Sequence, residues 1–230
     1  SGSLMESDMR GLEGVSKIYL PRKAQVAALD NVTVRIEKGQ FVGLVGPSGS
    51  GKTTFLMMVG AMMRPTQGRL LLDGQDVYQS PLAELAALRL RKIGFVFQTF
   101  NLVPYLTALQ NVMAPLMLAG QKSEDQVRRA TELLERVGLG NRLDHKPGEL
   151  SVGQQQRVSL ARMMANDAPL ILADEPTGNL DPQTADEALQ FLHKLNAEQG
   201  KTIVMVTHSP EAAKKCPRIL HCNEGRILDS

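Results

Sequence analysis

Apolar and polar residues recur along the chain with two periods, that of strands and that of helices. Residues 32–36 (VTVRI) alternate one by one, which predicts a half-exposed strand. Further strands are predicted at 40–45, 69–72, 93–97, 169–173 and 202–206, and a hairpin at 218–228 around Asn223-Glu224-Gly225. The runs at 169–173 and 202–206 are apolar almost throughout, which is typical of strands buried on both faces of a parallel sheet.

Helical periods separate these runs. Ser123 and Gln126 have the spacing of a capping box, so we expect Ser123 to be the N-cap of a helix that ends at Gly138. One apolar face of this helix is predicted, made of Val127, Ala130, Leu134 and Val137. Asp181 before Pro182 predicts the start of a second helix, which Gly200 ends.

Strands that alternate with helices place the chain in the α/β class, with a mostly parallel sheet. Between residues 99 and 165 the strand signals stop and helical ones dominate, which predicts a helical subdomain inserted in the α/β core. The length of 230 residues suits one large domain or two small ones, and no repeat or low-complexity linker is present; we interpret residues 9–230 as a single domain. Residues 1–4 are interpreted as an expression scar.

The composition narrows the class of protein. Hydrophobic residues make up 43% and charged residues 22%, which is ordinary for a globular chain and excludes disorder as its main state. Aromatic residues are 4% and the formal net charge is +2, so neither base stacking nor phosphate neutralisation favours a nucleic-acid partner. The two cysteines indicate reduced thiols in a cytosolic protein. No apolar run is long enough to cross a membrane, so a membrane function requires a partner.

One glycine-rich segment has the chemistry of a phosphate-binding loop. Residues 46–53 (GPSGSGKT) fit the pattern G-x-x-x-x-G-K-[ST], after a predicted strand and before residues compatible with a helix. The glycines let backbone N–H groups turn onto phosphate oxygens, Lys52 reaches the β- and γ-phosphates, and the Thr53 hydroxyl ligates Mg²⁺. The alternative is a plain turn between a strand and a helix. We therefore expect a nucleotide contact from Gly46, Pro47, Ser48, Gly49, Ser50, Gly51, Lys52, Thr53 and the adjoining Thr54.

Two carboxylates follow the buried strand predicted at 169–173. The C-terminal ends of such strands lie at the crevice where ligands of open α/β sheets bind. Asp174 is placed to hold Mg²⁺, and Glu175 to orient or deprotonate the attacking water. Two surface acids at the start of a turn before Pro176 are the alternative.

Further segments carry a resemblance to a known family. Residues 150–157 (LSVGQQQR) resemble the signature sequence of the ATP-binding-cassette (ABC) ATPases, and residues 178–181 (GNLD) resemble their D-loop. Gln98 after a strand is placed like the Q-loop glutamine, and His208 like the switch histidine. Tyr19, ahead of the first predicted strands, is placed like the aromatic residue that stacks on adenine. The motifs keep the family's order from about residue 10 to residue 210.

The resemblance implies a fold, an activity and a set of site residues. The implied fold is a P-loop NTPase core with an N-terminal antiparallel β part and an inserted helical subdomain. The implied activity is ATP hydrolysis with Mg²⁺, carried by Lys52, Gln98, Glu175 and His208. The Mg²⁺ ligands would be Thr53, Gln98 and Asp174. A homodimer that sandwiches ATP is also implied, with nucleotide contacts that include Tyr19, Ser151, Gly153, Gln154 and Asp181.

Each of these residues also has a plainer interpretation. Ser151 with Gln154 has capping-box form, so it could simply cap its own helix, although a capped helix end is also an anion site. Asp181 is equally a good N-cap, Gln98 an ordinary polar residue at a strand end, and Tyr19 a packing residue. The family's usual first glycine of the signature pair is Val152 here, and a β-branched residue requires an ordinary backbone conformation at that position.

The family resemblance implies membrane permease subunits as partners, and a location on the cytoplasmic face of the inner or plasma membrane. In this family a short permease helix enters a groove near the Q-loop, and residues 100–106 are either such a contact or subdomain core. The segments DEPTGNLD and 98–119 resemble the branch that serves macrolide export and lipoprotein release. A cell-division ATPase that moves no substrate and a soluble ABC protein of DNA repair or translation are the alternatives. Glu175 and His208 argue against a third alternative, a non-catalytic nucleotide sensor.

Overall fold

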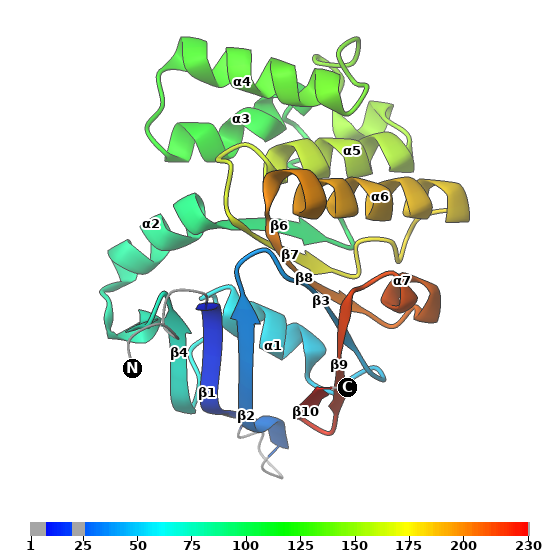
Figure 1. Ribbon diagram of the computed structural model, residues 1–230. Coiled ribbons are helices and arrows are strands. Elements are labelled where there is room, and N and C mark those ends of the chain that lie inside the picture. The colour runs from blue at the N-terminus through cyan, green and yellow to red at the C-terminus, as the bar shows by residue number, and fades with distance from the viewer. Residues whose placement is uncertain (1–7, 20–25, 230) are drawn as a thin grey trace.

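An antiparallel sheet forms the N-terminal part of the fold. The computed structural model describes residues 8–19 and 26–229, so residues 1–4 lie outside the described part (Figure 1). The strands are paired in the order β2-β1-β4-β5. Their bounds are Asp8–Tyr19 (β1), Val26–Glu37 (β2), Gln67–Leu72 (β4) and Gln75–Asp76 (β5). The antiparallel N-terminal part is therefore confirmed.

A second sheet of six strands forms the centre of the molecule, in the order β10-β9-β3-β8-β7-β6. All neighbouring pairs are parallel except the hairpin of β9 and β10. The bounds are Phe41–Val45 (β3), Ile93–Phe97 (β6), Leu170–Asp174 (β7), Thr202–Thr207 (β8), Arg218–Asn223 (β9) and Arg226–Asp229 (β10). Every strand predicted from an apolar run is present.

Seven α-helices occur in the described part of the chain. They are α1 (Lys52–Val59), α2 (Leu82–Lys92), α3 (Ala108–Leu118), α4 (Ser123–Arg136), α5 (Val152–Met163), α6 (Pro182–Gln199) and α7 (Pro210–Lys214). Short 3₁₀ helices lie at Val77–Gln79 (η1) and Pro147–Glu149 (η2). As predicted, Asp181 caps α6 and Gly200 ends it in the left-handed conformation.

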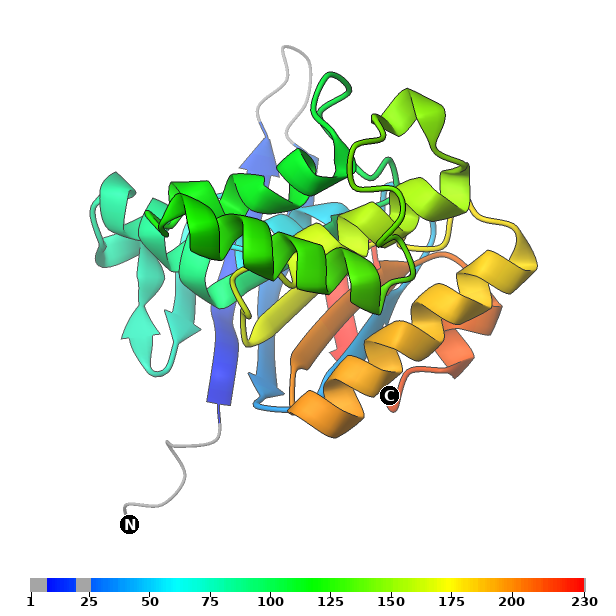
Figure 2. The ribbon, with the colours of Figure 1, turned by 90° about the horizontal axis from the view of Figure 1, so that it is seen from above.

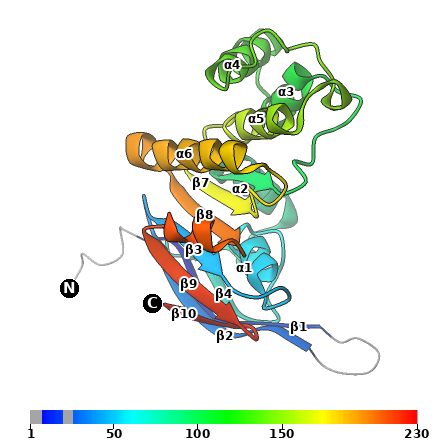
Figure 3. The same ribbon diagram turned by 90° about the vertical axis from the view of Figure 1, so that its right-hand side faces the viewer.

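The central sheet separates two hydrophobic cores. Because successive side chains of a strand point to opposite faces, Leu172 of β7 and Val204 of β8 join the core around α1, whereas Ile171 and Met205 join the core around α5 and α6. Figure 3 shows α1 between the two sheets and α6 on the opposite side of the central sheet. Burial on both faces explains why β7 and β8 are apolar along most of their length.

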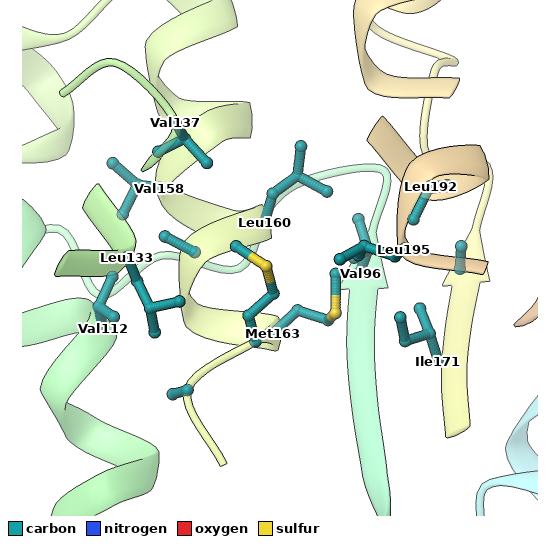
Figure 4. Close-up of a cluster of buried hydrophobic side chains, with 14 of the residues drawn as sticks. Val96, Val112, Leu133, Val137, Val158, Leu160, Met163, Ile171, Leu192 and Leu195 are labelled. Atoms are coloured by element: carbon teal, nitrogen blue, oxygen red, sulfur yellow. The ribbon is translucent and has the colours of Figure 1, made fainter. Parts of the chain in front are cut away.

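The helical subdomain consists of α3, α4 and α5. All three helices fall within the predicted range of 99–165. The structure describes every residue between β6 and β7, and none of these residues forms a strand. Viewed from above, α3 and α4 lie side by side over the strands, with α6 running beside them (Figure 2). Helix α5 joins the subdomain to the centre, because Val158 faces Val112 and Leu133 while Leu160 and Met163 lie toward Val96 and Ile171 (Figure 4).

Three expectations about local structure are wrong. Tyr19 does not precede the first strands but ends β1, a strand whose mixed composition hides it from the hydropathy pattern. Ser123 is the first residue of α4 rather than its cap, because Lys122 occupies the N-cap position and makes no side-chain cap bond. Val127 is 42% exposed, so it is not part of the buried face that Ala130 and Leu134 form.

Candidate functional site

Parallel strand order brings the predicted site residues to one edge of the central sheet. Val45, which precedes the glycine-rich loop, pairs with Thr207, which precedes His208. Asp174 pairs with Val206 on one side and with Phe97, which precedes Gln98, on the other. Because the C-terminal ends of parallel strands meet at the same edge, four segments distant in sequence converge there.

The backbone of residues 46–53 requires glycine at particular positions. Gly51 is the N-cap of α1 with φ 109°, and a Cβ there would lie 2.2 Å from the carbonyl oxygen of Ala28. A Cβ on Gly46 would lie 2.1 Å from the carbonyl oxygen of Cys222. Both glycines therefore pack against backbone that cannot yield, which fixes the loop at the N-terminus of α1. A helix N-terminus presents unpaired N–H groups and a positive dipole end, so it favours an anion.

Lys52 supplies a cation to this loop. Its side chain is buried, and Nζ donates hydrogen bonds to the carbonyl oxygens of Gly46 and Pro47, both at 2.8 Å. Both partners are neutral carbonyl oxygens, so no negative charge of the chain is paired with this ammonium through these bonds. The loop therefore places one positive charge among backbone N–H groups, the combination that a triphosphate requires.

A cavity of about 440 Å³ lies over the loop. Its walls are formed by Ala28, Ser48, Gly49, Gly51, Lys52, Thr53, Thr54, Gln98, Asp174, Glu175, Val206 and His208. The cavity thus collects ten predicted site residues, which come from the loop with the adjoining Thr54 and from the three strand ends. Nothing in the sequence marks Ala28 and Val206 as part of it.

The two carboxylates of the cavity differ in environment. Burial raises the pKa of the Asp174 carboxyl above its ordinary value, and the neighbouring Glu175 raises it further. The ammonium of Lys52 and a hydrogen bond with Thr53 oppose this rise in pKa. The ionised carboxylate of Asp174 is therefore poorly solvated, and a bound cation would lower the free-energy cost of this charge.

Thr53, Asp174 and Gln98 offer a hydroxyl, a carboxylate and an amide oxygen to one cavity. These are hard oxygen donors, the type that Mg²⁺ prefers, and Mg²⁺ in nucleotide sites takes its remaining ligands from phosphate and water. The donor set therefore fits Mg²⁺. Among the described residues no group of three or more histidine, cysteine, aspartate or glutamate side chains could hold a metal by itself.

Glu175 is held in an unusual conformation beside His208. Its φ is 47°, in the left-handed region that a non-glycine residue enters only at a cost. One carboxylate oxygen lies 2.7 Å from Nδ1 of His208, and the other accepts a hydrogen bond from the His208 backbone N–H at 3.2 Å. The Glu175 side chain is 14% exposed, whereas that of His208 is 65% exposed. The pair is therefore oriented toward the cavity with its histidine at the open side.

Gln98 is tied to the D-loop by two reciprocal hydrogen bonds. Its Nε2 donates to Oδ1 of Asn179 at 3.2 Å, and Asn179 Nδ2 donates to the Gln98 carbonyl at 3.1 Å. Asn179 lies in the GNLD segment, but the sequence assigns it no separate role. Strained backbone follows, since Phe100 and Asn101 have φ values of 59° and 49°. Arg162 of α5 donates to both of their carbonyl oxygens, at 2.5 and 2.7 Å.

The signature segment lies outside this cavity. Ser151 caps α5, its Oγ accepting from the Gln154 N–H at 3.2 Å while Gln154 Oε1 accepts from the Ser151 N–H at 3.0 Å, as predicted. Val152 lies inside the helix with an ordinary φ and a half-exposed side chain, and a Cβ on Gly153 would lie 3.2 Å from Cγ2 of Thr184. The N-terminus of α5 is therefore a capped, exposed helix end in the same chain, away from the glycine-rich loop.

The remaining predicted residues are not gathered at the cavity. Tyr19 is exposed, and its hydroxyl donates to Sδ of Met63 at 3.1 Å. Asp181 accepts hydrogen bonds from Thr184 and Gln183, and those from Thr184 are the main reason that its pKa is lowered. Gly46, Pro47 and Ser50 belong to the loop without lining the cavity. Ser50 is buried and its Oγ has no protein partner within the described chain.

Comparison with known proteins places the chain in a family. Residues 29–178 match the family described as "ABC transporter". A Thermotoga maritima protein named "Uncharacterized ABC transporter ATP-binding protein" is 50% identical over 216 residues, covering 94% of this chain and 92% of that protein. The "Macrolide export ATP-binding/permease protein MacB" of Syntrophobacter fumaroxidans is 47% identical over 222 residues, covering 96% of this chain. The chain spans only 31% of that relative's length.

A solved structure gives the same result in three dimensions. The "Dimeric structure of a post-hydrolysis state of the ATP-binding cassette MJ0796 bound to ADP and Pi" superposes with a TM-score of 0.90 at 43% sequence identity. The superposition covers 96% of this chain and 98% of that one. No helix in the described ranges is long and apolar enough to cross a membrane. The chain therefore belongs to the ABC transporter family, as one of its ATP-binding and ATP-hydrolysing cassettes.

Proposed function

We propose that ATP binds in the 440 Å³ cavity with its phosphates on the loop of residues 46–53. The loop N–H groups and Lys52 hold the β- and γ-phosphates, and Thr53, Asp174 and Gln98 hold Mg²⁺. Bound Mg²⁺ neutralises charge on the phosphate oxygens. Glu175 accepts the proton of the attacking water, and His208 keeps the Glu175 carboxylate in position. Tyr19 lies on the antiparallel sheet and stacks on the adenine.

One observation carries this proposal. The Glu175 carboxylate lies 2.7 Å from Nδ1 of His208 on the wall of the same cavity that Lys52 and the loop line. A base, its orienting partner and a phosphate cradle within one cavity are the three parts that hydrolysis of a γ-phosphate requires.

The substitution Glu175→Gln tests it. The amide keeps the size of the side chain but cannot accept the water's proton, so turnover should fall by about 10²- to 10⁴-fold while ATP binding persists. Glu211→Gln is the control, because Glu211 is an exposed glutamate on the neighbouring helix α7. Steady-state phosphate release and a fluorescent-nucleotide titration measure the two effects. Unchanged turnover in Glu175→Gln would show that another group is the base.

We infer that two copies enclose two ATP molecules. Ser151, Gly153 and Gln154 lie on an exposed helix end that does not line the chain's own cavity, and a helix end of this type suits a γ-phosphate. Asp181 caps α6 beside them and faces the second copy. A solved relative described as a dimeric ATP-binding cassette supports this arrangement. ATP then holds the pair together, and hydrolysis releases it.

We further propose that the partner in the membrane is a permease, as the name of the MacB relative suggests. A second cavity, of about 380 Å³, lies among β6, α2, α3 and α5, and most of its lining is apolar. Leu118 of α3 lines it and is 73% exposed. Residues 100–106 divide between the two earlier interpretations, since Phe100 is buried and Tyr105 is exposed. Residues 9–230 then act as one domain on the cytoplasmic face of the membrane, in macrolide- or lipoprotein-type transport.

A further inference from the structure

One buried polar side chain of α5 contacts the segment that carries Glu175. Gln156 is 1% exposed, and its Nε2 donates a hydrogen bond to the Pro176 carbonyl oxygen at 3.0 Å. Its neighbours Val158, Leu160 and Met163 pack in the hydrophobic core (Figure 4). A buried amide is unfavourable in such a helix unless it is hydrogen-bonded, and the contact with Pro176 satisfies its Nε2 donor, whereas its Oε1 has no hydrogen-bond partner among the described residues.

The partner of Gln156 lies next to the strained residue of the site. Glu175, directly before Pro176, has φ 47°. Its N–H donates to Val206 at 2.9 Å, and its carbonyl accepts from the Gly178 N–H at 3.0 Å. A strained conformation persists only where the surroundings fix it on several sides. Gln156 supplies the contact on the C-terminal side of Glu175, and it is a side-chain contact from another element.

The same helix carries the signature residues. Ser151 caps α5, and Gln156 lies in its second turn, so a rigid segment of helix separates them. We propose that Gln156 is a positioning residue for Glu175, which keeps the carboxylate aligned through the Pro176 carbonyl. The proposal rests on the role of Glu175 proposed above. It also makes α5 a direct connection between the helix end that faces the partner's nucleotide and the base of the chain's own site.

The test uses two substitutions at Gln156 and one matched control. Gln156→Met has a similar length and no donor, so kcat should fall by about tenfold, as expected for one lost hydrogen bond, with KM for ATP unchanged. Gln155→Met is the control, because the Gln155 amide is half-buried and donates to the Leu150 carbonyl at 3.2 Å, away from Glu175. ATP-dependent dimerisation should persist in all three proteins, since Ser151 keeps its cap.

The substitution Gln156→Glu distinguishes a loss of kcat caused by a misplaced Glu175 from one caused by a less stable protein. At about pH 8 the introduced carboxylate cannot donate to the Pro176 carbonyl, whereas toward pH 6 the buried carboxyl gains a proton and can donate. The kcat of Gln156→Glu relative to wild type should therefore rise as the pH falls, while that of Gln156→Met stays constant. This ratio is read from folded protein and does not depend on the stability of either variant.

Three results would overturn the proposal: a wild-type kcat in Gln156→Met, an equal loss in Gln155→Met, or parallel pH profiles for the two Gln156 variants. Glu175→Gln is measured alongside. If Glu175→Gln keeps its turnover, the roles assigned to the site are wrong. If it loses turnover while the Gln156 variants do not, only the role of Gln156 is wrong.

Discussion

Neighbouring carboxylates of the site have different surroundings, which suits them to the different tasks proposed above. Asp174 ends a strand buried on both faces, and burial together with Glu175 raises its pKa. Glu175 lies one residue further on, in a left-handed conformation that turns its carboxylate to His208. The sequence predicts that two carboxylates follow the strand. It does not predict that they point in different directions, because this depends on the backbone conformation of Glu175.

The substitution Asp174→Asn should stabilise the protein without nucleotide while lowering its activity. The pKa of Asp174 is raised in the folded state, so protonation favours folding, and the contribution to the free energy of unfolding is lost as the pH rises through that raised pKa. At neutral pH the asparagine removes a buried charge, so Tm should rise, and the difference should shrink as the pH falls. Hydrolysis with Mg²⁺ should fall by about 10²-fold, as for other lost groups that position charge.

Asp229→Asn is the control with the opposite sign. Hydrogen bonding from Arg218 lowers the pKa of the Asp229 carboxyl, so its stabilising contribution is present at neutral pH and is lost as the pH falls. Thermal unfolding over a pH series measures both variants. A lower Tm for Asp174→Asn at neutral pH would contradict the account of its burial.

At the level of helices and strands, the sequence predicts elements whose hydropathy pattern is regular. It fails for elements whose structure depends on contacts with other parts of the chain. β7 and β8 are recognisable because burial on both faces makes them apolar along most of their length. β1 is not, since its exposed and buried positions mix and bulges interrupt its pairing with β2. Ser151 and Ser123 show the limit of local motifs, because both have the spacing of a capping box. Ser151 caps α5 together with Gln154, whereas Ser123 is the first residue of α4 and follows the N-cap residue.

Two substitutions in α4 test which face of this helix is buried. Leu134 is fully buried, so Leu134→Ala should lower the free energy of unfolding by about 2 to 5 kcal/mol. Val127→Ala, on the same helix but 42% exposed, should change it by about 0.5 kcal/mol or less. Denaturant unfolding with a constant m-value gives both numbers. Equal losses would mean that α4 packs differently against α3 and α5.

For the whole molecule, the convergence of the site follows from the topology. Parallel strands β3, β8, β7 and β6 bring their C-terminal ends together, so the fold class and the strand-end motifs together predict that Lys52, Gln98, Asp174, Glu175 and His208 meet. Sequence does not reveal that Asn179 holds Gln98, because the bond depends on how two distant loops approach. The contact of Gln156 is not predictable from the sequence for the same reason. A helical glutamine is normally exposed, and only the structure shows that this one is buried against Pro176.

The apolar cavity of about 380 Å³ among β6, α2, α3 and α5 allows a prediction about the membrane partner. Leu118→Asp places a charge in this cavity, and a buried unpaired charge should weaken docking by at least about tenfold. Leu82→Asp is the control, because Leu82 is similarly exposed but does not line the cavity. Sedimentation with inverted membrane vesicles of the source organism measures the binding. Equal binding by both variants would place the docking surface elsewhere.

The arrangement of two chains around ATP is the central claim, and one measurement addresses it directly. In a Glu175→Gln background, which prevents turnover, light scattering with Mg²⁺ and ATP should report a doubled mass. Adding Ser151→Arg should keep the protein monomeric with ATP still bound, because a bulky side chain then occupies the place of the γ-phosphate. Thr107→Arg, which alters the same type of capping box on α3, should still dimerise. A dimer that persists in Ser151→Arg, or none in the Glu175→Gln protein, would contradict the account.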